Sequence, residues 1–184
     1  MHKKIPSIFT FISEFKKEEI LKLSKNVGII FRNYKENHNK NKIIQLKQFC
    51  KSNNKKFYLA NNFKLAVNLN LDGVYIPSFN KSLMFKNSNI RNNFLILGSA
   101  HNVKEIKLKE KQGVDVIFLS PLFKTKNYKK CLEIIKFNTI SNISKKKIIA
   151  LGGINKKKIN KLKITNAYGF SGISYFLKKF KNEK

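Results

Sequence analysis

The sequence predicts a (β/α)8 barrel, and three features of the chain support this fold. Short apolar stretches recur along the 184 residues, and segments of helical character separate them. Several stretches, such as 114–120 and 147–152, are almost unbroken apolar runs, as expected of parallel strands that are buried on both faces. Eight strands in strict alternation with helices favour a barrel, and an open doubly wound sheet is the alternative.

Each predicted strand is bounded by polar or glycine-containing segments, which mark where the chain turns. The predicted strands are 5–12, 27–32, 56–60, 73–76, 94–98, 114–120, 147–152 and 167–172.

The predicted helices lie between these strands. The segment 42–51 is the clearest, because Ile43, Leu46 and Phe49 recur with the spacing of one helix face. The connection after the fourth strand, 78–93, is rich in Asn and Ser and predicts a loop with one helical turn. The other predicted helices are 16–23, 63–71, 103–112, 128–143, 155–162 and 173–180.

Composition indicates one folded domain over residues 1–184. Hydrophobic residues make up 42% of the chain, which is enough to bury a core. No apolar run approaches the ~20 residues that span a bilayer, and no signal-peptide cleavage site follows the first apolar stretch. Cys50 and Cys131 have no metal-ligand spacing and are expected to be reduced thiols. These features predict a cytoplasmic protein without a membrane partner.

The formal net charge of +29 raises the question of a nucleic-acid partner. Only two of the 39 basic residues are arginines, Arg32 and Arg91, whereas readers of base edges depend on the bidentate guanidinium. The lysines are also spread along the whole chain. We therefore interpret them as a solvated surface and keep nucleic-acid binding as the less favoured alternative.

Two glycine-containing segments follow the last two strands and predict a phosphate site. Gly152 and Gly153 precede a lysine-rich helical segment, and the segment GFSGIS occupies 169–174. Glycines let the backbone approach an anion, the N–H groups of a helix start point at it, and loops seven and eight of a barrel commonly bind phosphate. The alternative is that these glycines only allow tight turns and close packing.

Other strand ends carry polar side chains toward the same end of the barrel. Ser99 and His101 follow the fifth strand, Thr125 follows the sixth, and Arg32 ends the second. His101 is a candidate acid or base, although a hydrogen-bonded structural histidine is the more common case. The only aspartates, Asp72 and Asp115, stand at the opposite ends of their strands, so no carboxylate is expected among these groups.

Six segments in order along the chain resemble the thiamine phosphate synthase and thiazole tautomerase family. They are 29–32 (IIFR), 72–76 (DGVYI), 99–102 (SAHN), 113–125 (GVDVIFLSPLFKT), 150–154 (ALGGI) and 169–174 (GFSGIS).

This resemblance implies a (β/α)8 barrel that binds a pyrimidine pyrophosphate and a thiazole phosphate. The synthases of the family join these two compounds into thiamine phosphate and release pyrophosphate. The family pattern assigns Arg32 and Ser99 to catalysis at the pyrophosphate, with Asn61 nearby. The residues that it assigns to phosphate binding, mainly of the thiazole phosphate, are Thr125, Lys129, Gly152, Gly153, Ile173 and Ser174.

The chain departs from the family pattern at the metal positions. The family places an Mg²⁺-binding aspartate after each of strands three and four, where this chain has Asn62 and Asn80. The family lysine after strand six is displaced, since Tyr128 stands in its register and Lys129 follows. The tautomerase histidine is replaced by Pro121. We therefore predict no metal site from the residues, and Mg²⁺ remains only what the resemblance implies.

Three functions are compatible with this pattern. The first is a divergent thiamine phosphate synthase. The second is a family member that binds thiazole or thiamine phosphate without synthase activity. The third is a lysine-rich nucleic-acid binder on a barrel scaffold. A homo-oligomer is compatible with each of them.

Overall fold

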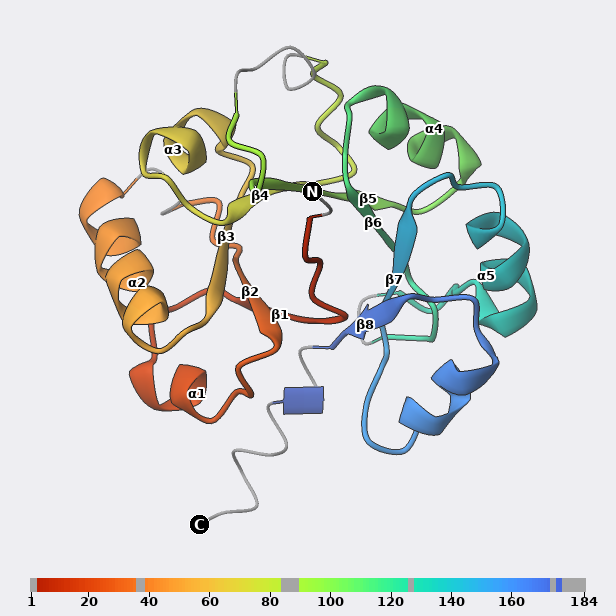
Figure 1. Ribbon diagram of the computed structural model, residues 1–184. Coiled ribbons are helices and arrows are strands. Elements are labelled where there is room, and N and C mark those ends of the chain that lie inside the picture. The colour runs from red at the N-terminus through yellow and green to blue at the C-terminus, as the bar shows by residue number, and fades with distance from the viewer. Residues whose placement is uncertain (1–2, 36–38, 84–89, 126–127, 173–174, 177–184) are drawn as a thin grey trace.

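The computed structural model describes residues 3–35, 39–83, 90–125, 128–172 and 175–176. Eight parallel strands pair in chain order and close into a barrel, with helices around its outside (Figure 1). This arrangement confirms the predicted (β/α)8 barrel over the open sheet. The strands are β1 (Ile8–Ile12), β2 (Val27–Phe31), β3 (Lys56–Ala60), β4 (Gly73–Ile76), β5 (Leu95–Ala100), β6 (Val116–Leu119), β7 (Lys147–Leu151) and β8 (Gly169–Ser171).

Every predicted strand is present. The helices are α1 (Lys17–Leu21), α2 (Lys40–Ser52), α3 (Phe63–Asn68), α4 (Val103–Lys111), α5 (Glu133–Ser141) and the 3-10 helix η1 (Ile159–Ile164). Most helices are shorter than predicted, but α2 extends beyond the predicted 42–51 at both ends.

The prediction of an α-helix at 155–162 is wrong, because the chain forms the 3-10 helix η1 at Ile159–Ile164 instead. Five lysines lie between 156 and 163, and no residue of η1 is buried. Repulsion among these lysines and the lack of a buried apolar stripe favour a short, tighter turn. The described part of the connection between β4 and β5 contains no helix, and residues 84–89 lie outside the described part. Of the predicted last helix, only residues 175–176 are described, and both are helical.

Aromatic side chains fill the inside of the barrel. Phe118 of β6 is fully buried and makes edge-on ring contacts with Phe9, Phe11 and Tyr75, at centroid distances of 5.0, 6.1 and 5.5 Å. A Cβ on Gly28, which pairs with Phe9 across β1 and β2, would lie 2.6 Å from the Phe9 ring. Side chains therefore fill the interior of the barrel, and a ligand is expected at the C-terminal ends of the strands.

A second apolar layer packs the helices onto the outside of the strands. Ile43, Leu46 and Cys50 are the buried residues of α2. This confirms Ile43 and Leu46 of the predicted stripe, whereas Phe49 is only partly buried against the core. Ile106 of α4 and Phe137 of α5 are also fully buried in this layer. Both cysteines are free thiols, and burial raises the pKa of Cys50 to about 12.

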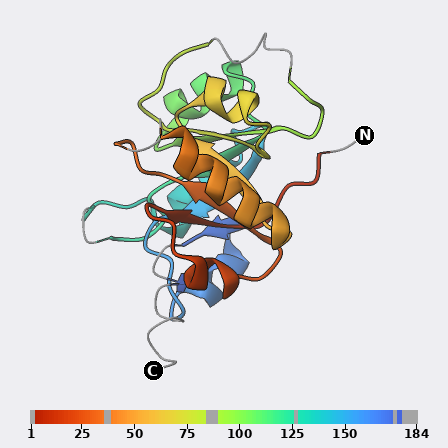
Figure 2. The same cartoon turned by 90° about the vertical axis from the view of Figure 1, so that its left-hand side faces the viewer.

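The aspartates belong to the N-terminal end of the barrel, as predicted. Asp72 accepts hydrogen bonds from the Phe57 backbone N–H and from Lys56. Asp115 accepts from the Ile96 backbone N–H and forms an ion pair with Lys3 at 2.9 Å. Both carboxylates therefore tie neighbouring strands together. The N-terminal segment lies at this same end of the barrel, opposite the loop between β6 and α5 (Figure 2).

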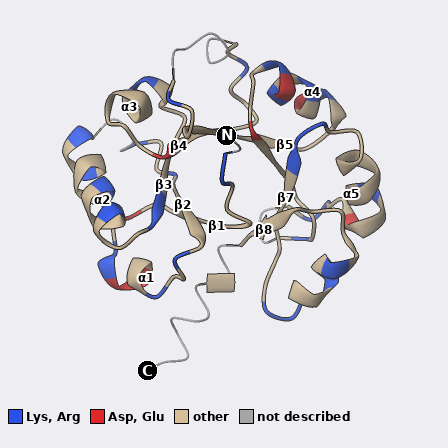
Figure 3. Ribbon diagram, in the orientation of Figure 1, with Lys and Arg blue, Asp and Glu red and all other residues tan. Residues whose placement is uncertain are grey.

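Lys and Arg residues are distributed along the elements around the barrel rather than gathered on one side (Figure 3). The predicted solvated lysine surface is consistent with this distribution. Among the described residues, no helix is long and apolar enough to cross a membrane.

We expect Phe118→Ala to lower the free energy of unfolding by about 3–5 kcal/mol, because it opens a cavity at the centre of the aromatic interior. Urea unfolding followed by circular dichroism measures this change. Ile135→Ala is the matched control: Ile135 is 85% exposed, so its truncation should change stability by less than about 0.5 kcal/mol. Equal effects of the two substitutions would contradict the assignment of the interior.

Candidate functional site

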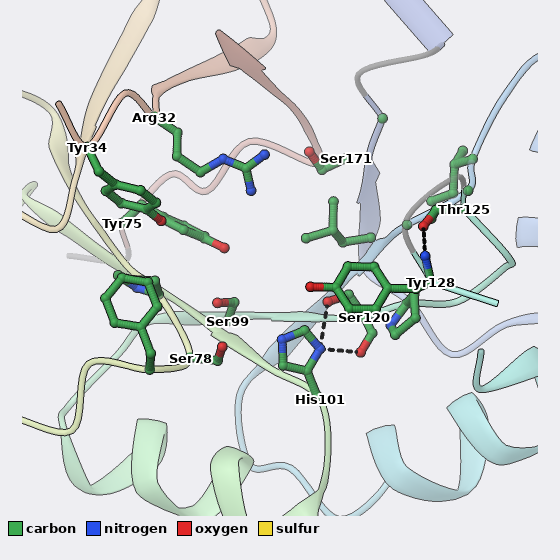
Figure 4. Close-up of a pocket in the computed structure, with 18 residues that line it drawn as sticks. Arg32, Tyr34, Tyr75, Ser78, Ser99, His101, Ser120, Thr125, Tyr128 and Ser171 are labelled. Atoms are coloured by element: carbon green, nitrogen blue, oxygen red, sulfur yellow. Dashed lines mark hydrogen bonds between the residues drawn. The ribbon is translucent and has the colours of Figure 1, made fainter. Parts of the chain in front are cut away.

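A cavity of about 540 Å³ opens at the C-terminal ends of the strands, and its wall is built from the loops after β2 and after β4 to β8 (Figure 4). Arg32 is the one permanently charged side chain among the described residues of this wall, which include no carboxylate and no lysine. Hydroxyl groups supply most of the other polar atoms. A site of this composition is suited to an anionic ligand.

Arg32 is fixed by the barrel interior below it. Its backbone N–H donates to the carbonyl of Ile12, and its guanidinium lies 4.4 Å from the centroid of the Phe11 ring. This stacking leaves the planar group free to donate hydrogen bonds in its own plane. In Figure 4 the Arg32 side chain extends from the β2 side into the cavity.

Tyr75 and Ser99 form the floor beside Arg32. Burial raises the pKa of Tyr75 to about 12, and a hydrogen bond with Ser99 partly opposes that rise. Tyr34, on the loop after β2, also has a pKa raised by burial, against the lowering effect of the Arg32 charge. Both phenols are therefore protonated at neutral pH and can donate hydrogen bonds to a ligand.

His101 is held by a structural hydrogen bond at the cavity wall, and its acid or base role stays a prediction. Its Nδ1 lies 2.8 Å from the carbonyl oxygen of Ser120 and 3.2 Å from the Ser120 hydroxyl. The carbonyl can only accept, so Nδ1 carries the proton in the neutral ring and Nε2 is the basic atom. The imidazole lines the cavity while the bond to Ser120 holds its orientation.

The loop after β6 supplies the wall opposite Arg32. The Thr125 backbone N–H donates to the Tyr128 carbonyl, and the Tyr128 backbone N–H donates to the Thr125 hydroxyl, each at 3.0 Å. This reciprocal pair places both side chains on the cavity wall. Thr125 was predicted from the sequence, and Tyr128 was noted there only because it occupies the register of the family lysine.

Gly152 and Gly153 line the cavity in a backbone conformation that favours glycine. Their φ angles are +98° and +68°, and a Cβ on Gly153 would lie 2.6 Å from the carbonyl oxygen of Lys124. The predicted helix start directly after them is absent, because η1 begins only at Ile159 and the Asn155 side chain accepts from Lys158 N–H instead. Loop backbone, without a regular helix end, therefore surrounds this part of the cavity.

Ser171, at the end of β8, is a buried hydroxyl with an unusual environment. Its side chain is fully buried, lines the cavity and has no hydrogen-bond partner among the described residues. A buried hydroxyl without a partner costs free energy and is uncommon in folded proteins. The Ser171 Oγ is therefore placed to bond a ligand in the cavity.

Four predicted positions do not line the described cavity wall. The Asn61 Oδ1 accepts a hydrogen bond from Asn80 at 2.7 Å, just beside the cavity wall. Lys129 is exposed and does not belong to the wall, and its predicted phosphate contact stays a prediction. Ile173 and Ser174 lie outside the described residues.

The positions expected to bind Mg²⁺ do not fit this ion. The Asn62 side chain accepts from the Leu65 backbone N–H and caps α3, and the Asn80 side chain accepts from the Ser82 backbone N–H. Mg²⁺ in proteins is held by one or two carboxylates with substrate phosphates. Within the described residues, no three His, Cys, Asp or Glu side chains group closely enough to hold a metal ion.

Sequence reasoning missed the aromatic rim of the cavity. Tyr34 and Phe79, on the loops after β2 and β4, are 43% and 63% exposed and make an edge-on ring contact at 5.7 Å. Tyr34 follows Arg32 by two residues and Phe79 lies in the polar connection after β4, so neither stands in a periodic pattern. The signal available was the presence of a large aromatic residue in each loop.

Comparison with known proteins agrees with the resemblance. The sequence profile described as thiamine monophosphate synthase matches residues 17–176. A protein of Aquifex aeolicus named "Putative thiamine-phosphate synthase 2" is 31% identical over 169 residues, which cover 89% of this chain and 78% of that protein. The thiamine-phosphate synthase of Prochlorococcus marinus strain SARG is 30% identical over 158 residues, 82% of this chain and 45% of that protein.

The fold agrees with a solved structure as well. The thiamine phosphate pyrophosphorylase from Pyrococcus furiosus superposes with a TM-score of 0.73 at 18% identity, over 97% of this chain and 96% of that chain. At that identity the superposition shows the fold alone. The profile match and the Aquifex relative show the family. This chain belongs to the thiamine monophosphate synthase family.

Proposed function

We propose that this protein is a thiamine phosphate synthase that joins a pyrimidine pyrophosphate to a thiazole phosphate and releases pyrophosphate. The observation that carries the proposal is the single cavity that gathers Arg32, Ser99, Thr125 and the two loop glycines. Family membership supports a role in thiamine biosynthesis. A cytoplasmic location and one domain over residues 1–184 are part of the same proposal.

The two sides of the cavity suit two phosphorylated ligands. Arg32, Ser99 and Tyr75 lie on one side, and Thr125 lies across from them (Figure 4). We assign the pyrophosphate to Arg32 and Ser99 and the thiazole phosphate to Thr125 and the backbone of Gly152 and Gly153. A cavity of this size holds two small ligands in contact, which supplies the proximity that the reaction requires.

The chemistry asked of the protein is stabilisation of negative charge. The bond between the pyrimidine's carbon and the pyrophosphate oxygen breaks, and the thiazole nitrogen forms the new bond to that carbon. The departing pyrophosphate keeps the bonding electrons, and Arg32 and the hydroxyl donors stabilise its charge. Fixed donors in a largely enclosed site contribute more than they would in water.

The second candidate is a family member that binds these ligands without joining them. The observation that favours it is the engagement of Asn62 and Asn80 in structural hydrogen bonds, which leaves the two expected metal positions without a cation-binding role. Calorimetry with thiazole phosphate or thiamine phosphate would then show binding while no product forms.

An assay of the purified protein with both substrates, with Mg²⁺ and with EDTA, tests the synthase proposal. We expect thiamine phosphate to appear under at least one condition, and detection by mass spectrometry identifies it directly. Absence of product under both conditions would refute synthase activity. Tight and steeply salt-dependent RNA binding in its place would support the nucleic-acid alternative.

We expect Arg32→Lys to lower kcat/KM by about 10²-fold, because lysine cannot reproduce the planar pair of donors to a phosphate. The chain offers a matched control in Arg91→Lys, since Arg91 is exposed at the N-terminal end of the barrel and donates to the carbonyl of Leu71. The control should retain wild-type kinetics. Equal losses in both variants would argue against a specific role for Arg32.

We expect Ser171→Ala to raise the free energy of unfolding by about 1–3 kcal/mol and to weaken ligand binding, because it removes a buried hydroxyl that has no partner among the described residues. The control Ser141→Ala removes a hydroxyl that donates to the Asn138 carbonyl, so it should lower stability by about 0.5–1.5 kcal/mol and leave binding unchanged. Urea unfolding and calorimetry with inorganic pyrophosphate and thiazole phosphate measure both quantities. A Ser171→Ala protein that binds both ligands normally would contradict the ligand contact.

A further inference from the structure

A buried lysine lies directly behind the cavity wall. Lys109, on α4, is fully buried although lysine side chains almost never are. Burial of an ammonium group is costly unless each of its protons has an acceptor. Here all three protons are satisfied: the Nζ donates to the carbonyls of Pro77 and Asn80 and to the Gln112 side chain, at 2.8, 2.9 and 2.9 Å.

Gln112 completes this buried polar cluster. Its side chain is also fully buried, and its Nε2 donates to the carbonyls of Asn80 and Ser82, at 2.9 and 2.8 Å. Lys109 and Gln112 therefore satisfy three backbone carbonyls of the segment 77–82, which we call the β4 loop. The described part of this connection contains no helix, so no helical N–H groups reach the carbonyls of Asn80 and Ser82, and the Pro77 carbonyl accepts from the Asn80 backbone N–H as well as from Lys109.

The β4 loop is part of the cavity wall. Pro77, Ser78 and Phe79 all line the cavity, and the Asn80 side chain donates to Asn61 at the end of β3. The space for the Lys109 stem exists because residue 98 of β5 is glycine, where a Cβ would lie 3.0 Å from the Lys109 Cδ. The buried cluster thus connects α4 and β5 to the wall next to Ser99.

We propose that Lys109 is a positioning residue that holds the β4 loop in its ligand-binding arrangement, so that this side of the cavity is built without a divalent cation. The inference rests on the proposed function for its ligands. Its physical basis is that a fixed cation and an amide bind the loop carbonyls from behind, while the two side chains expected to bind Mg²⁺ are engaged elsewhere. The pyrophosphate side of the cavity, not the thiazole phosphate side, depends on this loop.

The test compares wild type with Lys109→Met, which keeps the length and apolar stem and removes the ammonium. We expect faster amide hydrogen exchange in 77–82, a KM for the pyrimidine pyrophosphate raised by about tenfold, and an unchanged KM for the thiazole phosphate, because a wall shifted by about 1 Å loses ligand contacts locally. Mg²⁺ should alter exchange in 77–82 of neither protein. Lys111→Met, on the exposed face of the same helix, is the matched control and should match wild type.

Two results would overturn the inference. One is a folded Lys109→Met protein with wild-type exchange in 77–82 or with both KM values changed equally. The other is slower exchange in wild-type 77–82 when Mg²⁺ replaces EDTA, which would show that a metal orders the loop. Should Lys109→Met not fold, Gln112→Met retains the ammonium and removes two loop hydrogen bonds, and it should show the same split between ligands to a smaller extent.

Failure of the proposed function would be recognised separately. Without turnover, calorimetry with inorganic pyrophosphate and with thiazole phosphate replaces the two KM values, and Lys109→Met should weaken only the first. If wild type binds neither ligand, the proposed function fails, and the exchange data for 77–82 still decide whether Lys109 holds the loop.

Discussion

The hydrogen-bonded closure of the sheet between β1 and β8 is the constraint on which the site depends. Ile8 and Phe9 are the β1 residues that pair with β8, and Gly169 approaches Ser7 so closely that a Cβ would lie 1.8 Å from the Ser7 carbonyl oxygen. This short seam brings the end of β8, with Ser171, next to the end of β2, with Arg32. Without closure, residues from opposite ends of the sequence would not share a cavity.

The two aspartates of the chain lie at the end of the barrel away from the cavity. Carboxylates tie β3 to β4 and β5 to β6 at the N-terminal end, where Asp72 and Asp115 accept from neighbouring backbone N–H groups. At the other end, hydroxyls and one guanidinium surround the cavity, and the described wall includes no acid. The potential that favours an anion in the cavity therefore comes from Arg32 and from a described wall without carboxylates, while most of the described lysines lie at the surface.

The amides at the two positions expected to bind Mg²⁺ and the buried Lys109 lie in neighbouring segments, after β3, β4 and β5. In this chain the amides after β3 and β4 cap a helix and close a turn, and one of them also bonds Asn61. Behind the β4 loop the buried Lys109 carries a positive charge, and its ammonium group is held by three oxygen acceptors. Amide side chains suit this arrangement because they both donate and accept, whereas carboxylates would place unpaired negative charge beside the anion site.

The sequence by itself determined the eight strands, their parallel order and the end of the barrel that carries the site, because alternation and unbroken apolar runs depend only on local pattern and burial. It also indicated Arg32, Ser99, Thr125 and the loop glycines, since each directly follows a strand. Only the tertiary structure decided that Ser171 is buried without a hydrogen-bond partner among the described residues, that Tyr34 contacts Phe79, and that Lys109 reaches the β4 loop 29 to 32 residues earlier in the chain. The ring contact and the Lys109 hydrogen bonds join loops and a helix that lie far apart in sequence. No periodicity encodes them, because they form only when the chain folds into the barrel.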